Sequence, residues 1–243
     1  ATNVKELAAL GKKHGALVIV DGVCATGGEV MHQDEWGIDV ALTASQKAIG
    51  VPPGLALLVA GPKAMEKFKS RKTPVLNYYA DWNEWLPIMQ AYESRKPGYF
   101  GTPAVNLVWA LNVSLKEILA EGMNARFTRH GKLSTSFKAA VQALGLKQVP
   151  VRSELYATTL SAVYYPEGVD ASMLKHVDEA GVIVAGGLHP AIKTKYFRVG
   201  HMGAATGADI LATVGAVETG LKKSGYKFEL GAGIHAAQKA LNS

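Results

Sequence analysis

The chain alternates short apolar runs with amphipathic segments, a pattern typical of an α/β fold. Residues 3–14 repeat apolar side chains at helical spacing and predict a helix, which Gly15 ends. The continuous apolar runs at 16–20, 39–45 and 54–61 predict three short strands. The first of these has the composition of a strand that is buried on both faces.

The connections between these runs predict the strand directions. Only about nine residues separate the second and third runs, too few for a helical crossover, so this pair is expected to be antiparallel. Nearly twenty residues, roughly the length of a crossover, separate the first and second runs, which allows a parallel pair. The expected result is a mixed, mostly parallel sheet with helices outside it.

The remaining pattern predicts further helices and strands, of which those from residue 155 onward form a second, smaller α/β unit. It indicates a helix at 61–72, an irregular aromatic-rich loop at 73–103, helical segments at 103–122 and 123–145, strands at 155–166, 182–187 and 196–203, and helices at 170–181 and 208–225. A loop of that length in a compact domain is usually functional or part of an interface. We therefore predict two domains, residues 1–120 and 121–243.

Composition excludes several classes of protein. The chain has 243 residues, 48% of them hydrophobic, enough for a large core in one or two domains. It has no run of 18 apolar residues, so we expect no membrane span. The single cysteine, Cys24, excludes a disulfide framework within the chain and a zinc cluster. The net charge of +6 is scattered, which favours a basic surface suited to small anionic substrates over nucleic-acid binding.

Asp21 and Lys47 are the first candidates for chemistry. Each follows a predicted strand closely, and parallel strands would bring both to the same sheet edge, where ligands bind in such folds. A lysine among small neighbours can attack a carbonyl, and an aspartate there can keep a heteroaromatic nitrogen protonated. The alternative is that Asp21 caps a turn and Lys47 reaches into solvent.

Three residues of the second unit are weaker candidates. Arg198 ends a predicted strand and could bind a carboxylate through two hydrogen bonds, although a surface salt bridge is the simpler interpretation. His189 and His201 have no second ligand at a metal-like spacing, so we predict no metal site. No G-x-G-x-x-G motif supports a dinucleotide site.

The ordered set of these motifs resembles the class V pyridoxal-phosphate aminotransferases, especially the alanine–glyoxylate and serine–pyruvate group. The resemblance is carried by "VIVDGVCATGGEVMHQDEWGIDVALTASQKAIGVPPGLALLV", "GYFGTPAVNL", "GVIVAGG" and "YFRVGHMGAAT" and covers essentially the whole chain. It implies a fold-type-I pyridoxal-phosphate-dependent transferase, with a large domain that is incomplete here and a smaller C-terminal domain. It also implies that Lys47 forms a Schiff base with pyridoxal phosphate. By the same resemblance Asp21 pairs with the ring nitrogen, Val23 packs on the ring, and Gln46 contacts the phosphate.

The resemblance further implies a homodimer with shared active sites. Tyr99 and Thr102 would reach the phosphate of the neighbouring subunit's cofactor, and Arg198 would bind the substrate carboxylate. The aromatic-rich loop at 73–103 would then lie at the dimer interface and the site entrance. Family members carry over a hundred further residues upstream, so a companion segment or chain is expected to complete the large domain.

The expected reaction is transamination of a small amino acid, alanine or serine, with glyoxylate or pyruvate. The alternatives are a phosphoserine or aminoethylphosphonate transaminase and a non-catalytic α/β subunit of this fold. A cysteine desulfurase is disfavoured, because such an enzyme needs a mobile cysteine in the small domain and Cys24 lies beside Asp21.

Overall fold

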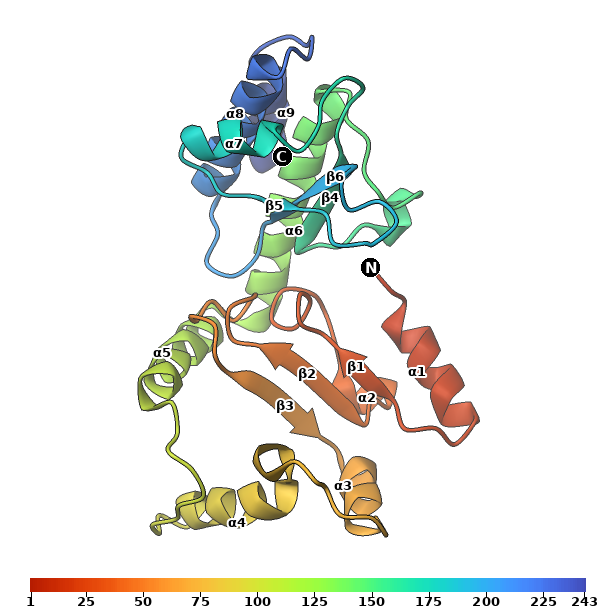
Figure 1. The fold of residues 1–243 in the computed structure, drawn as a ribbon, viewed down its shortest axis with the longest axis vertical. Helices are drawn as coiled ribbons and strands as arrows, with labels where there is room; N and C mark the ends of the chain where they lie inside the picture. Colours follow the sequence, from red (N-terminus) through yellow and green to blue (C-terminus); the bar gives the residue numbers. More distant parts are fainter.

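The chain folds into two α/β parts stacked along its long axis, as a computed structural model of residues 1–243 shows (Figure 1). The first part contains α1 (Val4–Lys13), β1 (Ile19–Asp21), α2 (Gln33–Trp36), β2 (Val40–Ala44), β3 (Ala56–Ala60), α3 (Pro62–Lys69), α4 (Trp82–Glu93) and α5 (Val105–Glu121). The second part contains α6 (Met123–Ala143), β4 (Leu160–Tyr164), α7 (Met173–Glu179), β5 (Ala185–Gly186), β6 (Tyr196–Gly200), α8 (Gly207–Lys223) and α9 (Ala232–Leu241).

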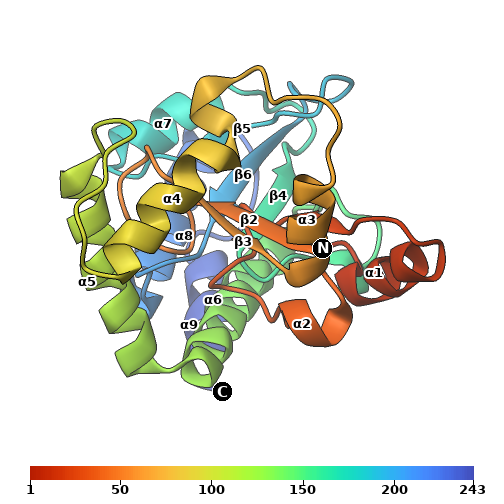
Figure 2. The same ribbon diagram turned by 90° about the horizontal axis from the view of Figure 1, so that it is seen from below.

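The first sheet has the order β1-β2-β3 and is mixed, as the connections predict. β1 and β2 are parallel, with Asp21 opposite Leu42. β2 and β3 are antiparallel, with Ala44 opposite Ala56. In Figure 2 this sheet lies between α5 on one side and α1 on the other.

The burial expected for the first strand is wrong. β1 spans only Ile19–Asp21, and the Ile19 side chain is 61% exposed. The physical reason is that β1 is an edge strand of this sheet, paired with β2 alone, so no neighbour covers its other side. An apolar hollow of about 260 Å³ lies beside it, lined by residues that include Leu17, Ile19, Phe68 and Trp82.

The segment 73–103, expected to be irregular, contains the twelve-residue helix α4. Asp81 caps this helix by accepting a hydrogen bond from the Asn83 amide at 3.0 Å. The helix also contains Pro87, a residue that normally argues against a helix interior. Trp85 of α4 packs against Phe100 with ring centroids 4.8 Å apart, and tertiary packing of this kind can outweigh the weak local signal.

The second sheet is antiparallel throughout, in the order β4-β6-β5. Its core contains Phe137 of α6, Phe197 of β6 and Leu221 of α8, all fully buried. The helix α9 packs against α6 and α8 and was absent from the sequence-based prediction. Two glycines near its start dilute the apolar periodicity that would reveal it.

The two parts meet where α5 ends and α6 begins. Gly122 separates the helices with φ of +81°, a backbone conformation that favours glycine. Ile118 of α5 packs with Ile49 and Val51 of the first part, whereas α6 belongs to the core of the second. This packing supports the boundary predicted at residues 120 and 121, which stays a prediction. No helix combines the length and the apolar character needed to cross a membrane.

Candidate functional site

Asp21 and Lys47 lie at, or just beyond, the carboxyl ends of two neighbouring parallel strands. Asp21 is the last residue of β1, and Lys47 lies three residues after β2 ends, in the turn at residues 45–49. Parallel strands open onto one edge, so the predicted juxtaposition of the two segments follows from this pairing.

The Lys47 turn is tightly hydrogen-bonded. The Gly50 amide donates to the Lys47 carbonyl at 2.9 Å. The fully buried Ser45 hydroxyl donates to the Pro52 carbonyl at 2.7 Å and accepts from the Leu55 amide at 3.2 Å. The backbone around the lysine is therefore fixed by hydrogen bonds that do not involve the amine.

The Lys47 amine itself is uncommitted. Its side chain is half-buried, and its Nζ atom forms no hydrogen bond or ion pair. One Asp21 oxygen, Oδ1, accepts a hydrogen bond from the Val23 amide at 3.0 Å, which is the turn-capping contact weighed as the alternative role. The other Asp21 oxygen has no partner within the chain, so capping leaves half of the carboxylate available.

The structure does not bring Tyr99 and Thr102 to Lys47 within one chain. Their hydroxyl oxygens lie 3.2 Å apart, and both residues are exposed. The connection from α4 to α5 that holds them runs at the lower left of Figure 1, whereas β2 ends on the side of its sheet that faces α6. Gln46, in contrast, is exposed directly beside Lys47.

Arg198 is held in place from the neighbouring strand. It lies half-buried in β6, and its Nε atom donates to the Gly186 carbonyl of β5 at 2.8 Å. It forms no ion pair with a carboxylate of this chain, so the surface salt bridge considered as the simpler interpretation is absent. The two terminal nitrogens of the guanidinium remain free to bind an anion.

The loop that follows β6 returns to the Lys47 turn. A β-carbon at Gly203 would lie 3.5 Å from the Lys47 carbonyl oxygen. The Gly203 amide also donates to Nε2 of His130 at 3.0 Å. The approach of Gly203 to Lys47 places the loop after the strand of Arg198 next to the Lys47 turn, which sequence spacing alone does not reveal.

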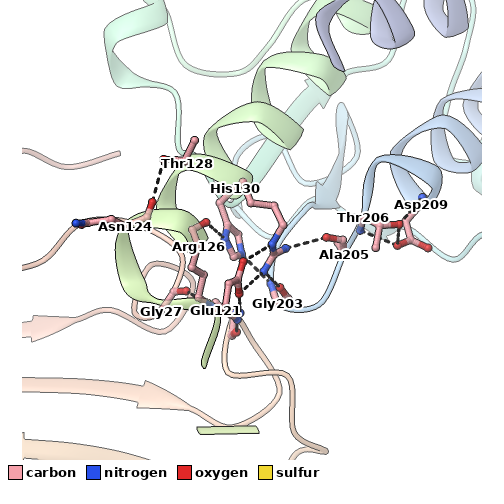
Figure 3. A network of polar contacts seen from close by, with 12 residues as sticks. Gly27, Glu121, Asn124, Arg126, Thr128, His130, Gly203, Ala205, Thr206 and Asp209 are labelled. Atoms are coloured by element: carbon pink, nitrogen blue, oxygen red, sulfur yellow. Dashed lines mark hydrogen bonds and ion pairs between the residues drawn. The ribbon is translucent and has the colours of Figure 1, made fainter. Parts of the chain in front are cut away.

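Sequence reasoning missed a polar cluster at the start of α6. Glu121 accepts from Arg126 at 2.8 Å and from Arg129 at 2.6 Å. Glu121 and Arg126 lie together in Figure 3. The hydrogen bond from Arg129, helped by that from Arg126, lowers the pKa of Glu121 to about 2. The signal in the sequence was two arginines and His130 on a helix that was assigned only to packing.

His201 makes a polar contact, as expected for its loop. It is fully buried, and its Nε2 atom lies 3.0 Å from the Ser161 hydroxyl. Burial, with a smaller contribution from the charge of Lys138, lowers the pKa of His201 to about 4. No three His, Cys, Asp or Glu side chains gather as metal ligands would.

Comparisons with known proteins identify the family and the fold of the chain. A family model described as Aminotransferase class-V matches residues 1–210. L-aspartate–glyoxylate aminotransferase of Paracoccus denitrificans is 39% identical over 228 residues, which cover 93% of this chain and 56% of the relative. Alanine–glyoxylate aminotransferase 1 of Saccharomyces cerevisiae is 42% identical over 189 residues, which cover 76% of this chain and 49% of the relative. The chain thus spans about half the length of these curated relatives.

Among solved structures, the pyridoxamine–pyruvate aminotransferase of Mesorhizobium loti superposes with a TM-score of 0.90 at 29% identity. The match covers 99% of this chain and 61% of that one. It confirms the predicted fold class, a fold-type-I pyridoxal-phosphate-dependent transferase. Together with the family match, it shows that the chain belongs to the class V aminotransferases.

Proposed function

We propose that the protein transfers the amino group of a small amino acid, such as alanine or serine, to glyoxylate or pyruvate, with pyridoxal phosphate as cofactor. The observation that carries this proposal is the placement of Lys47 and Asp21 at one edge of the first sheet, on adjacent parallel strands. The names of the relatives support glyoxylate as the acceptor, since both curated relatives described above are glyoxylate aminotransferases.

The residues present fit pyridoxal phosphate. The cofactor needs an amine for its aldehyde and an anionic partner for its ring nitrogen. Lys47 has an amine without a partner, and Asp21 has one free carboxylate oxygen. Val23 is half-buried in the adjoining loop, and the exposed Gln46 amide can reach a phosphate. When bound, the cofactor supplies an electron sink for the charge that develops at the substrate Cα.

The side chains of this chain then have distinct tasks. The Lys47 amine would remove the proton from the substrate Cα and deliver it to the C4′ carbon of the cofactor, a general acid–base role. Asp21 holds a proton on the ring nitrogen of the cofactor. Arg198 binds the substrate carboxylate with its two terminal nitrogens, and the Gly186 carbonyl fixes the direction of its side chain.

The function is tested by trapping and by donor preference. Reduction of the holoprotein with borohydride, followed by peptide mass mapping, is expected to place a pyridoxyl group on Lys47. A pyridoxyl group on another lysine would contradict the assignment. A panel of amino donors is expected to favour alanine or serine, and a preference for phosphoserine or aminoethylphosphonate would favour the alternative transaminases.

The exposed face of α5 supports a homodimer. Trp109, Val113 and Leu119 leave 72%, 56% and 74% of their surfaces exposed on this helix. A free surface rarely carries such a row of large apolar side chains, and a second copy of the chain would cover it. Tyr99 and Thr102 immediately precede this helix, so a dimer formed here would carry them toward the partner's site.

Replacing Trp109 with glutamate is expected to weaken the dimer. Losing a central aromatic anchor costs about 2 kcal/mol or more, roughly a 30-fold rise in the dimer dissociation constant. Light scattering across a concentration series measures this change. The matched control is Leu230→Glu, which alters a similarly exposed side chain in the second part and is expected to leave the dimer intact. Equal dimer stability in wild type and Trp109→Glu would contradict an α5 interface.

The open edge of β1 supports a further strand beside it. Ile19 is exposed there, next to the apolar hollow that Phe68 and Trp82 help to line. We place a segment of the large domain at this edge, from the same protein or from a companion chain. Intact-mass measurement of the purified protein distinguishes the two sources, because only a companion chain would appear as a second mass of roughly 15 kDa, the size needed to close such a core.

A further inference from the structure

We propose that Arg126 is a positioning residue that holds the Lys47 turn and the loop after Asp21 in register with each other. This inference rests on the proposed role of Lys47. Arg126 would act through the backbone of the site loops, without touching the cofactor or the substrate.

The contacts of Arg126 join the two loops at one guanidinium group. Its Nε atom donates to the Gly27 carbonyl at 2.7 Å, and its Nη2 atom donates to the Ala48 carbonyl at 2.5 Å. Gly27 lies in the loop that follows Asp21, and Ala48 directly follows Lys47. Figure 3 shows Arg126 between Gly27 and Glu121. A rigid planar group therefore fixes the spacing of the two segments that carry the candidate catalytic side chains.

The energetics argue against a role in stability alone. Arg126 is only 5% exposed, and its charge is balanced by Glu121 at 2.8 Å. Burying an ion pair costs several kcal/mol of desolvation, so apolar residues of similar size would often stabilise a fold equally well. The planar fork of arginine satisfies three acceptors in fixed directions, which neither an apolar side chain nor a lysine can reproduce. A guanidinium group is therefore well suited to fixing the relative positions of the two loops.

The same helical turn also holds the loop that follows β6. Arg129 donates to the Gly203 carbonyl at 3.0 Å and to the Ala205 carbonyl at 2.8 Å, while it binds Glu121. His130 accepts from the Gly203 amide at Nε2. The strand with Arg198 leads into this loop, so the network ties the backbone segments of all three candidate site residues to the first turns of α6.

The loop after Asp21 also packs closely against the second part of the chain beside Arg126. A β-carbon at Gly28 would lie 2.5 Å from Cγ2 of Thr159 and 3.4 Å from the His130 ring. The adjacent Glu29 carboxylate accepts from the Thr158 amide at 2.5 Å. The loop after Asp21 is thus clamped between the two parts, and the guanidinium sets its position along that contact.

The experiment compares Arg126→Ala and Arg126→Lys with wild type and with Glu218→Gln. Glu218 is a matched control because it is also buried and also binds backbone amides, those of Gly231 and Gly233, remote from the site. Each variant is studied first without its cofactor and then as the holoenzyme, at a temperature at which circular dichroism shows both forms folded. Three quantities are measured. The first is the rate at which pyridoxal phosphate, added to the cofactor-free protein, labels Lys47, read by borohydride quenching and peptide mass mapping. The other two are kcat and KM of the holoenzyme for the amino donor.

Arg126→Ala is expected to slow Lys47 labelling and to lower kcat by about 100-fold each, the effect of displacing a reacting group by about 1 Å. The KM for the donor is expected to change little, because Arg198 is untouched. Arg126→Lys is expected to be intermediate, and N-ethylguanidinium is expected to restore part of the labelling rate of Arg126→Ala. Glu218→Gln is expected to lower stability but to label and react as wild type does.

Labelling and kcat of Arg126→Ala at wild-type values would overturn the positioning role. If that variant does not fold, Glu121→Gln takes its place, since it keeps the side-chain volume and removes the charge that orients Arg126. Wild-type labelling in Glu121→Gln would then overturn the proposal. Absence of Lys47 labelling in the wild type is a different outcome, because it contradicts the proposed function and with it the premise of this inference.

Discussion

Replacing Lys47 with arginine is expected to lower kcat for transamination by about 10⁴-fold or more, the upper range for loss of a general acid–base group. The guanidinium stays protonated at all accessible pH values, so it can neither attack the cofactor aldehyde nor take a proton from the substrate Cα. The charge is retained and Lys47 has no partner in the structure, so folding is expected to be unaffected. Initial rates of 2-oxo acid formation measure the effect.

Lys175→Arg is the matched control for this change. Lys175 is exposed in α7 of the second part, and the substitution there is expected to leave kcat within error of the wild type. A kcat for Lys47→Arg within tenfold of the wild type would show that another group carries the proton. Loss of activity in both variants would point instead to a general effect of the exchange.

Replacing Asp21 with asparagine is expected to lower kcat by about 10²–10³-fold. A carboxylate beside a basic nitrogen raises the pKa of that nitrogen by about 1–3 units, and the amide of asparagine gives no such effect. The asparagine oxygen can still accept the hydrogen bond from the Val23 amide, so the loop is expected to keep its shape. Steady-state rates and thermal unfolding together separate the chemical loss from any structural one.

Asp178→Asn is the control, since Asp178 is exposed at the end of α7 and far from the strand ends of the first sheet. Unchanged kcat in Asp21→Asn would show that Asp21 only caps its turn, through the hydrogen bond that it accepts from the Val23 amide. A large fall in melting temperature of this variant would also favour that structural role.

The sequence predicted most of what depends on local spacing. The short connection between 39–45 and 54–61 gave the antiparallel pair β2 and β3, and the longer one allowed the parallel pair that brings Asp21 and Lys47 to one edge. The resemblance supplied the family, which the match over residues 1–210 confirms. The specific site residues stay predictions, supported by the free amine of Lys47 and the uncommitted guanidinium nitrogens of Arg198.

What the sequence did not reveal depends on contacts between distant segments. Arg126 reaches Gly27 and Ala48 across 99 and 78 positions, and no periodicity records such a contact. The exposure of Ile19 was missed for a similar reason, because an apolar run indicates a buried strand whether or not a neighbour is present. Likewise, α4 forms despite Pro87 because aromatic side chains around Trp85 pack together.

The buried histidines His130 and His201 make the stability of the fold depend on pH. His130 accepts from the Gly203 amide at Nε2 and donates from Nδ1 to the Arg126 carbonyl, so its ring must be neutral. Burial lowers the pKa of His130, and lowers that of His201 to about 4. Unfolded histidines bind protons near pH 6.5, so below that value protons favour the unfolded chain. The stabilisation is complete above pH 6.5 and is lost as the pH falls toward 4, by about 3 kcal/mol for His201 alone. Mild acid therefore weakens the contacts of His130 that join the two parts, while Glu121, with a pKa of about 2, stays ionised in that range.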